Sequence, residues 1–257
     1  MAEGKLAGKW ALITGSGRGF GQHIARRFAK EGANVVVHYN VSQEGAEQMA
    51  EEIRSLGREA HVVQGDTTSW EQVERFVGEA FEHAGRIDVL VNNVGDVAPE
   101  QSTWRDLRED LVDRVIATDV KGTLWVTHEV GQRMLDQGEG VIVNICSNVV
   151  VMGSQRCPQY AASKYGVLGI TKSYAHAFAP TVRVNAVGPG WMETSALVGR
   201  QEWTPERAKQ VLDRTPLGRL PGLDEMTGPV LFLATDDSSS MTGNFVLADC
   251  GYSMVGA

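Results

Sequence analysis

One tyrosine and one lysine are spaced so that they can act together in proton transfer. Tyr160 and Lys164 stand four residues apart, and Ser147 precedes the tyrosine by thirteen residues. Residues i and i+4 share a helix face, so both side chains can point into one site. A free tyrosine titrates near about pH 10, and we expect the nearby ammonium to lower the pKa of Tyr160. Tyr160 would then act as general acid/base toward an alcohol or ketone, with Ser147 hydrogen-bonded to the carbonyl oxygen.

A glycine-rich segment between an apolar run and a helical pattern predicts a phosphate-binding turn. Glycine lets the backbone turn tightly and approach a pyrophosphate closely, and the helix that follows offers free N–H groups at its positive end. Its place after the first predicted strand favours this interpretation over a plain strand-to-helix turn. The segment comprises Thr14, Gly15, Ser16, Gly17, Arg18, Gly19, Phe20 and Gly21.

Short β-branched runs alternate with helical stretches along the whole chain. The runs are continuously apolar, which is typical of strands buried on both faces of a parallel sheet. We therefore predict an α/β, doubly wound Rossmann-type fold: a seven-stranded parallel sheet with helices on both faces, and ligands at the carboxyl ends of the strands. The predicted strands are 10–14, 34–39, 60–64, 88–91, 140–146, 182–187 and 245–248.

Two longer segments interrupt this alternation, and both follow predicted strand ends. Gly95–Trp104 and Gly188–Arg219 are candidate lids or binding loops. No linker composition and no repeat divides the rest of the chain. We therefore expect a single domain over residues 1–257, with a substrate-loop excursion at about 188–219.

Composition and charge argue against several classes of protein. The 257 residues are 42% hydrophobic and 22% charged, which are ordinary globular values. The net charge of −8 argues against binding to nucleic acid or to an anionic membrane. No apolar run reaches the roughly 18 residues of a membrane span, and the N-terminus lacks the features of a signal peptide. Three cysteines and six histidines, without metal-ligand spacing, predict reduced thiols in the cytoplasm and no metal site.

The order of these motifs resembles that of the short-chain dehydrogenase/reductase family over essentially the whole chain. The glycine segment has the spacing T-G-x-x-x-G-x-G, Asn92–Gly95 resembles N-N-A-G, and Tyr160–Lys164 matches Y-x-x-x-K. Pro189, Gly190 and Thr194 match the family's P-G motif and the threonine that holds the nicotinamide carboxamide. The resemblance implies an NAD(P)-dependent oxidoreductase that acts on CH–OH or C=O groups, with the serine, tyrosine and lysine named above as catalytic residues.

The same resemblance implies that the cofactor lies along the ends of the strands. The family contacts the adenine through the residue that corresponds to Asp66. The implied cofactor-binding residues are Gly15, Ser16, Gly17, Arg18, Gly19, Phe20, Gly21, Tyr39, Asn40, Ser42, Asp66, Thr67, Asn93, Val94, Gly95, Tyr160, Lys164, Pro189, Gly190, Met192 and Thr194.

Asp119 stands where the family usually has an asparagine. The carboxylate can accept hydrogen bonds there, but it lacks the amide donors. If it is ionised near Lys164, it favours the charged ammonium. Two interpretations stay open, a tolerated isostere or an altered pH profile. We count Asp119 among the candidate catalytic residues, together with Ser147, Tyr160 and Lys164.

The end of the second predicted strand bears on the choice between NADP(H) and NAD(H). An acidic residue there would bind the ribose 2′-hydroxyl and repel a 2′-phosphate. By alignment with the family the position is Tyr39, and no carboxylate occurs before Glu44. Arg18 suits a 2′-phosphate, and Asn40 and Ser42 can add hydrogen bonds. Although a second basic residue after the strand is absent, we expect NADP(H) to be favoured over NAD(H), with NAD(H) or dual use as alternatives.

The residues expected around the substrate are mostly apolar. They predict a secondary alcohol or ketone on a small to medium, mostly apolar skeleton, cyclic ones included. The family implies 3-oxoacyl reduction on acyl carrier protein as an alternative, ranked lower because the matching docking region, Met134–Glu139, is acidic. A cofactor-binding sensor or scaffold is the non-enzyme alternative, which the presence of the catalytic residues disfavours. The candidate substrate residues are Ser147, Val149, Met152, Cys157 and Trp191.

The family commonly assembles through paired helices and a C-terminal strand. The resemblance therefore implies a homotetramer, or a homodimer. The helix that carries Tyr160 would present a second face with Leu168, Tyr174 and Phe178. The expected partner is a small-molecule substrate, with no nucleic acid and no membrane.

Overall fold

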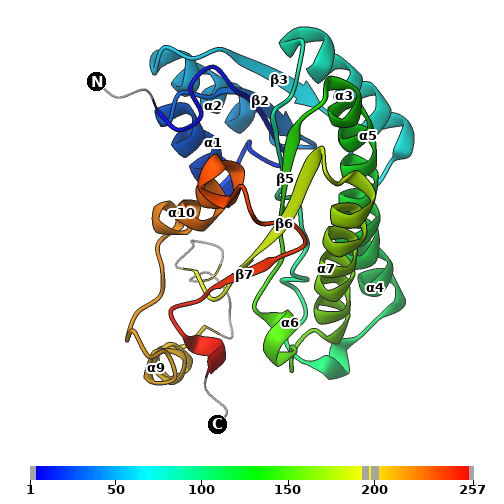
Figure 1. Ribbon diagram of the computed structural model, residues 1–257. Helices are drawn as coiled ribbons and strands as arrows, with labels where there is room; N and C mark the ends of the chain where they lie inside the picture. The colour runs from blue at the N-terminus through cyan, green and yellow to red at the C-terminus, as the bar shows by residue number, and fades with distance from the viewer. Residues whose placement is uncertain (1–3, 193–196, 198–202, 255–257) are drawn as a thin grey trace.

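A parallel sheet runs through the middle of the molecule (Figure 1). The computed structural model describes residues 4–192, 197 and 203–254. In this part of the chain, seven strands pair in the order β3-β2-β1-β4-β5-β6-β7, all parallel, which confirms the predicted doubly wound Rossmann-type sheet. The strands are β1 (Trp10–Ile13), β2 (Asn34–Tyr39), β3 (Ala60–Gln64), β4 (Val89–Asn92), β5 (Gly140–Ile145), β6 (Val182–Pro189) and β7 (Phe245–Ala248).

Helices cover both faces of the sheet (Figure 1). They are α1 (Gly19–Lys30), α2 (Gln43–Ser55), α3 (Trp70–Ala84), α4 (Glu109–Val115), α5 (Gly122–Gln137), α6 (Val149–Met152), α7 (Pro158–Phe178), α9 (Pro205–Asp213) and α10 (Leu223–Ala234). Helices α1, α2 and α10 pack on one face, and α3, α5 and α7 pack on the other. None of the helices in the described ranges is long and apolar enough to cross a membrane.

Burial on both faces explains why the strands are continuously apolar. Ala11 and Ile13 of β1 pack in the layer of α1 and α2, whereas Leu12 packs in the layer of α3 and α5. All three side chains are fully buried. A fully buried aliphatic side chain of leucine or isoleucine size gains about 1.5–3 kcal/mol of transfer free energy. The two layers therefore hold the strand ends in fixed positions.

Several strand ends differ from the predicted ranges by one or two residues. Strand β6 continues through Pro189 because Gly188 and Pro189 pair with β7. Strand β4 begins one residue after Asp88, whose carboxylate accepts a hydrogen bond from the backbone N–H of Trp10 at 2.8 Å. Strands β1 and β5 each end one residue earlier than predicted.

The chain order reverses between β1 and β4. Strands β1, β2 and β3 extend the sheet in one direction, and β4 to β7 extend it in the other. Open α/β sheets bind ligands in the crevice that forms at such a point, outside the carboxyl ends of the strands. A small cavity lined in part by Thr14, Thr67 and Val94 lies there. The fold thus brings the segments that follow β1, β3 and β4 to one crevice.

Candidate active site

The glycine-rich segment forms the turn between β1 and α1. Gly15 and Gly19 have φ angles of 66° and 59°, which glycine adopts readily. A Cβ on Gly21 would lie 2.4 Å from the carbonyl oxygen of Gly15, so a side chain there would prevent this close approach. Arg18, at the N-cap of α1, makes no side-chain capping bond. The first N–H groups of α1 lack intrahelical partners and can bind a pyrophosphate.

Arg18 and the residues after β2 meet at one corner of this turn. A Cβ on Gly17 would lie 2.9 Å from the Ser42 carbonyl oxygen, so the turn packs directly against the start of α2. Arg18 is exposed, and within the described chain its side chain makes no hydrogen bond or ion pair. Tyr39 is half-buried and Asn40 is exposed. The corner therefore offers a cation and hydroxyl groups, without a carboxylate in the position after β2.

Asp66 and Thr67 follow β3, on the side expected for the adenine. Oδ1 of Asp66 accepts hydrogen bonds from the backbone N–H and the hydroxyl of Thr68, both at 2.8 Å. Thr67 is buried. On the other side of the glycine turn, Nδ2 of Asn93 donates to the carbonyl of Thr14 at 3.0 Å. These residues border the crevice, and their contacts with a cofactor stay a prediction.

Tyr160, Lys164 and Ser147 come together at the carboxyl end of β5. Both Tyr160 and Lys164 lie near the start of α7, and Nζ of Lys164 lies 5.6 Å from the centre of the Tyr160 ring. The same Nζ donates to the carbonyl of Ile145, the last residue of β5, at 3.2 Å. Ser147 follows two residues later, and its hydroxyl lowers the pKa of Tyr160. This arrangement can hold a carbonyl oxygen between two hydroxyl groups beside a cation.

Burial and several neighbouring groups act on the pKa of Tyr160. Burial raises this pKa above its usual value and Asp119 raises it too, whereas Lys164 and Ser147 lower it. The ammonium acts in the expected direction, but it does not overcome burial. The expectation that the ammonium lowers the Tyr160 pKa is therefore confirmed in direction, and the net pKa with a bound cofactor stays a prediction.

Asp119 forms a buried pair with Lys164. The Asp119 side chain is fully buried, and its Oδ2 lies 3.5 Å from Nζ of Lys164. Oδ2 also accepts from the Ser163 hydroxyl at 2.7 Å, and Oδ1 accepts from the Asp96 backbone N–H at 2.7 Å. Burial lowers the pKa of Lys164, but Asp119 and Tyr160 raise it more, so it lies above its usual value. The geometry agrees with the expectation that Asp119 favours the charged ammonium.

A π-helical segment, Ile116–Lys121, carries Asp119 between α4 and α5. Such segments are rare and frequently occur at functional sites. The three groups around the Asp119 carboxylate are an ammonium, a hydroxyl and a backbone N–H, and all of them donate. An asparagine would present only one oxygen to these three donors. The carboxylate is therefore the better match for this position in this chain.

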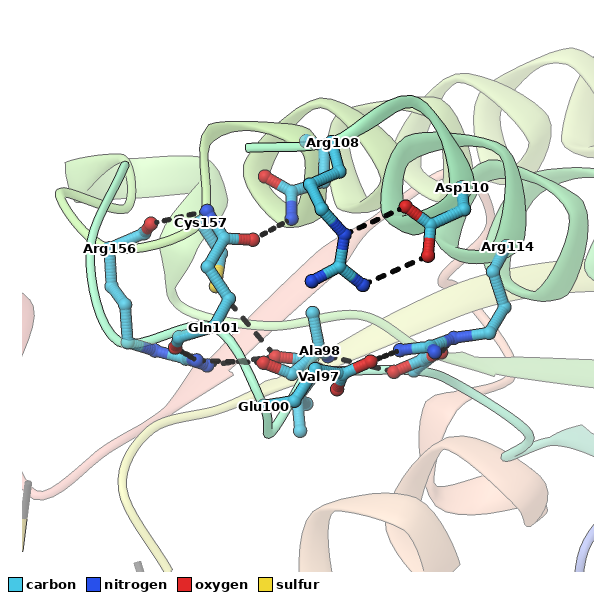
Figure 2. A network of polar contacts seen from close by, with 11 residues as sticks. Val97, Ala98, Glu100, Gln101, Arg108, Asp110, Arg114, Arg156 and Cys157 are labelled. Carbon is cyan, nitrogen blue, oxygen red and sulfur yellow. Dashed lines mark hydrogen bonds and ion pairs between the residues drawn. The ribbon is translucent and has the colours of Figure 1, made fainter. Parts of the chain in front are cut away.

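Arg156 ties the segment after β4 to the start of α7 (Figure 2). Its guanidinium donates to the carbonyls of Val97 and Ala98, both at 2.8 Å, and to that of Gln101. Gln101 is fully buried and its Nε2 donates back to the Arg156 carbonyl at 3.0 Å. The segment Gly95–Trp104, a candidate lid, is thus held in place by this Arg156 network. Sequence reasoning missed Arg156.

Arg114 extends these contacts toward the buried pair (Figure 2). Its guanidinium donates to the carboxylates of Asp96 and Glu100, both at 2.5 Å. Asp96 also donates its backbone N–H to Asp119. Hydrogen bonds therefore link the segment Gly95–Trp104 continuously with the Asp119 carboxylate, which pairs with Lys164.

The candidate substrate residues near α6 and β6 are only partly buried. Val149 and Met152 lie in α6, and Met152 is 43% exposed. Trp191 is half-buried, and its ring lies 5.4 Å from that of Trp203 with the planes inclined at 30°. These side chains leave apolar surface exposed, and their contact with a substrate stays a prediction.

Cys157 is more buried than the other candidate substrate residues. It packs with Ala98 and Val115 against Tyr160, and its contact with a substrate stays a prediction. Cys146 is buried as expected, and Cys146 and Cys250 are free thiols. Over 4–192, 197 and 203–254, no three or more histidine, cysteine, aspartate or glutamate side chains gather as metal ligands would.

The end of β6 borders the crevice from the opposite side. The backbone N–H of Gly190 donates to the Ala248 carbonyl at 3.2 Å, and a Cβ on Gly190 would lie 2.4 Å from that of Asp249. Pro189 is buried and Met192 is half-buried. Thr194 lies outside the described residues, as does the rest of the excursion at 193–196 and 198–202.

Comparison with known sequences finds relatives along nearly the whole chain. The family model for the short chain dehydrogenase matches residues 9–205. The chain is 37% identical over 249 residues to a 3-oxoacyl-(acyl-carrier-protein) reductase of Thermotoga maritima, over 96% of this chain and 98% of the relative. It is 34% identical over 252 residues to an L-rhamnose 1-dehydrogenase (NAD(P)(+)) of Azotobacter vinelandii, over 96% of this chain and 97% of the relative.

Solved structures share the same architecture. A gluconate 5-dehydrogenase from Burkholderia cenocepacia, in complex with NADP and tartrate, has a TM-score of 0.92 at 30% identity and covers 98% of both chains. An NAD+-bound xylitol dehydrogenase has a TM-score of 0.89 at 32% identity and covers 96% of this chain and 100% of its own. Similar structures thus contain either cofactor.

Proposed function

Because the chain belongs to the short-chain dehydrogenase family, we propose that it is an NADP(H)-dependent oxidoreductase that interconverts a secondary alcohol and a ketone. The substrate is small to medium and mostly apolar. The observation that carries the proposal is the convergence of Ser147, Tyr160 and Lys164 at the end of β5, on the crevice that the glycine turn borders.

The proton step is assigned to Tyr160. A nicotinamide cofactor, when bound, supplies a hydride to the carbonyl carbon or accepts one from the alcohol carbon. In reduction the Tyr160 hydroxyl donates its proton to the carbonyl oxygen, and in oxidation the tyrosinate takes the proton from the alcohol. Ser147 donates a hydrogen bond to the same oxygen. Lys164, which Asp119 keeps charged, favours the tyrosinate when the proton leaves.

Features of the corner around Arg18 support NADP(H) over NAD(H). Arg18 is exposed and has no acidic partner in the described part of the chain, so its guanidinium is available to a 2′-phosphate. Tyr39 stands where a carboxylate would bind a ribose 2′-hydroxyl, and the Ser42 side chain makes no capping bond at α2. Glu44 instead accepts a hydrogen bond from Gln48 at 3.1 Å. An NAD(H)-dependent dehydrogenase is the alternative.

The side chains around Ser147 support the substrate class. Val151 and Met152 are 52% and 43% exposed and offer apolar contacts on one side. The Trp191–Trp203 pair adds a flat apolar surface. A polyol or sugar is the alternative substrate, because relatives named for L-rhamnose and xylitol share the fold.

Turnover by the purified chain tests this function. NADPH is mixed with cyclic and aliphatic ketones, and NADP+ with sugars and polyols, while the nicotinamide absorbance is followed. We expect the wild type to consume one NADPH per ketone reduced and Tyr160→Phe to be nearly inactive. Tight cofactor binding without turnover of any substrate would instead identify a cofactor-binding sensor or scaffold.

Reduction of a 3-oxoacyl group on acyl carrier protein is the second candidate function, favoured by the 37% identity to such a reductase. The acidic segment Met134–Glu139 immediately precedes β5, whereas Ser147 follows it, so the two lie at opposite ends of the strand. The segment therefore does not oppose docking at the crevice of its own chain, and that argument against a carrier is wrong.

An acidic carrier would have a basic surface to dock on beside α9. Arg207 and Arg214 line a cavity of about 290 Å³ with Gln210, Val211, Tyr252 and Asp213, whose carboxylate is paired with Lys209. Neither arginine has an acidic partner among residues 203–254 or elsewhere in the described chain. A carrier-bound substrate whose KM rises in Arg214→Ala, with the KM of a small ketone unchanged, would establish this function. A KM for the carrier-bound substrate that is equal in Arg214→Ala and in the wild type would reject it.

We also propose a homo-oligomer, a tetramer or a dimer, in a reducing compartment such as the cytoplasm. The expected face of α7 is partly used inside the chain, because Phe178 is buried against Gly131 and Tyr174 hydrogen-bonds His128 at 3.2 Å. Tyr165, 53% exposed, lies on the same helix and is available to a partner. The free thiols of Cys146 and Cys250 fit a reducing compartment. Light scattering during size exclusion measures the assembled mass.

A further inference from the structure

A buried histidine joins three strand ends at the glycine turn. His38, the fifth residue of β2, is 1% exposed. Its Nδ1 accepts a hydrogen bond from the Gly15 backbone N–H at 3.1 Å, and its Nε2 lies 3.0 Å from the Gly65 carbonyl oxygen. Gly15 follows β1, Gly65 follows β3, and β2 lies between these strands. One imidazole therefore bridges the segments that follow β1 and β3.

The two partners determine which ring nitrogen carries the proton. The Gly15 N–H can only donate and the Gly65 carbonyl can only accept, so Nδ1 is unprotonated and Nε2 carries the hydrogen. The ring also packs on Phe76, with centroids 4.5 Å apart. Burial lowers the pKa of His38 from 6.5 to about 4, although the Gly65 carbonyl and the facing carboxylate of Asp66 raise it. The imidazole is neutral at neutral pH.

Backbone contacts place the same strand end directly against the turn. The Ser16 N–H donates to the His38 carbonyl at 3.0 Å, and the His38 N–H donates to the Ser16 hydroxyl at 3.1 Å. On the far side of the turn, Asn93 Nδ2 lies 3.4 Å from the Gly15 carbonyl oxygen. Gly15 is thus held between β2 and the loop after β4, and the imidazole supplies the acceptor for its N–H.

We propose that His38 is a positioning residue for the cofactor. Its neutral imidazole sets the spacing between the glycine turn, which would hold the pyrophosphate, and Asp66, which would face the adenine. The inference rests on the proposed function, because it requires a dinucleotide in this crevice. Loss of the Nδ1 acceptor would leave the partly buried Gly15 N–H without its partner. Cofactor binding would weaken, while proton transfer at Tyr160 would stay intact.

Two variants with the same side-chain branching isolate the acceptor. In His38→Asn, an amide oxygen can occupy the place of Nδ1 and accept from Gly15, whereas His38→Leu offers no acceptor. We expect the Kd for NADPH, from fluorescence titration, to rise about tenfold in His38→Leu and by less than about threefold in His38→Asn. The kcat at saturating NADPH should stay near the wild-type value in both. Ile53→Ala, in α2, is the control for lost stability alone.

The outcomes separate this inference from the proposed function. Wild-type protein that binds neither NADPH nor NADH would overturn the function. A Kd in His38→Leu equal to that of the wild type, or equal weakening in both His38 variants, would overturn the role of the acceptor. If His38→Leu does not fold, nitrogen NMR of the wild-type ring decides: an unprotonated Nδ1 at neutral pH supports the proposal, and a protonated Nδ1 overturns it.

Discussion

Asp119 and Lys164 form an ion pair directly behind the candidate proton donor, with 3.5 Å between Oδ2 and Nζ and neither side chain more than 4% exposed. Removing two charges from water is costly unless further hydrogen bonds satisfy them. The Asp119 carboxylate accepts two such bonds, from Ser163 and Asp96. One carboxylate therefore keeps the ammonium charged and also raises the pKa of Tyr160.

Replacing Asp119 by asparagine separates its charge from its shape. Since Asp119 raises the pKa of Tyr160, Asp119→Asn lowers it, and alcohol oxidation reaches its full rate at a lower pH. We expect kcat/KM to fall by less than about a hundredfold, which is about 2.7 kcal/mol of barrier. Profiles of rate against pH for both proteins measure the shift. A larger loss would give the carboxylate a specific role in the reaction, and an unshifted profile would show that its charge does not act on Tyr160.

Removal of Arg18 tests the cofactor preference. Arg18→Ala should raise the Kd for NADPH by about ten- to a hundredfold and that for NADH by less than about threefold. The reason is that the guanidinium would contact only the 2′-phosphate. Arg58→Ala, an exposed arginine between α2 and β3, serves as the control. Equal losses for both cofactors would show that Arg18 contacts a part they share.

Arg156 and Arg108 provide a matched pair of substitutions (Figure 2). Two guanidinium nitrogens of Arg156 reach the three carbonyls, and Arg156→Lys replaces them by a single nitrogen. The substitution should cost about 1–3 kcal/mol, or about 2–4 °C in Tm for each kcal/mol. Arg108→Lys alters only the exposed pair with Asp110, 2.9 Å apart, and should leave Tm close to that of the wild type. Thermal unfolding compares the two, and an equal Tm for both variants would refute the structural role of Arg156.

His38 links stability to pH. The unfolded ring, with a pKa of 6.5, binds a proton before the folded ring, whose pKa is about 4. Stability from the neutral ring is thus fully present above about pH 6.5 and is lost as the pH falls through 4. The difference is on the order of 3 kcal/mol. Urea unfolding of His38→Asn should show a smaller loss between pH 7 and pH 4.5 than the wild type, and parallel losses would contradict this.

Local patterns predicted the strands, the glycine turn and the tyrosine–lysine face because each depends on spacing within a short segment. The contacts that the sequence did not predict join residues that are far apart along the chain. Arg156 reaches carbonyls 55 to 59 residues away, and His38 reaches Gly15 and Gly65 across 23 and 27 residues. Because every residue has a backbone carbonyl, the sequence does not indicate which carbonyls these side chains contact. Spacing likewise identifies Lys164 as a neighbour of Tyr160 but contains no information on burial, which decides the pKa.

Transfer of deuterium tests the central claim, hydride exchange at a carbonyl with Tyr160 as the proton donor. Wild type and Tyr160→Phe are given NADPH with deuterium at both C4 positions and the best ketone of the panel, and the alcohol product is analysed by mass spectrometry. We predict one deuterium on the carbinol carbon per NADPH consumed by the wild type. We also predict a rate at least about a hundredfold lower in Tyr160→Phe, with NADPH binding retained. Product without deuterium, or a Tyr160→Phe variant as fast as the wild type, would contradict the account.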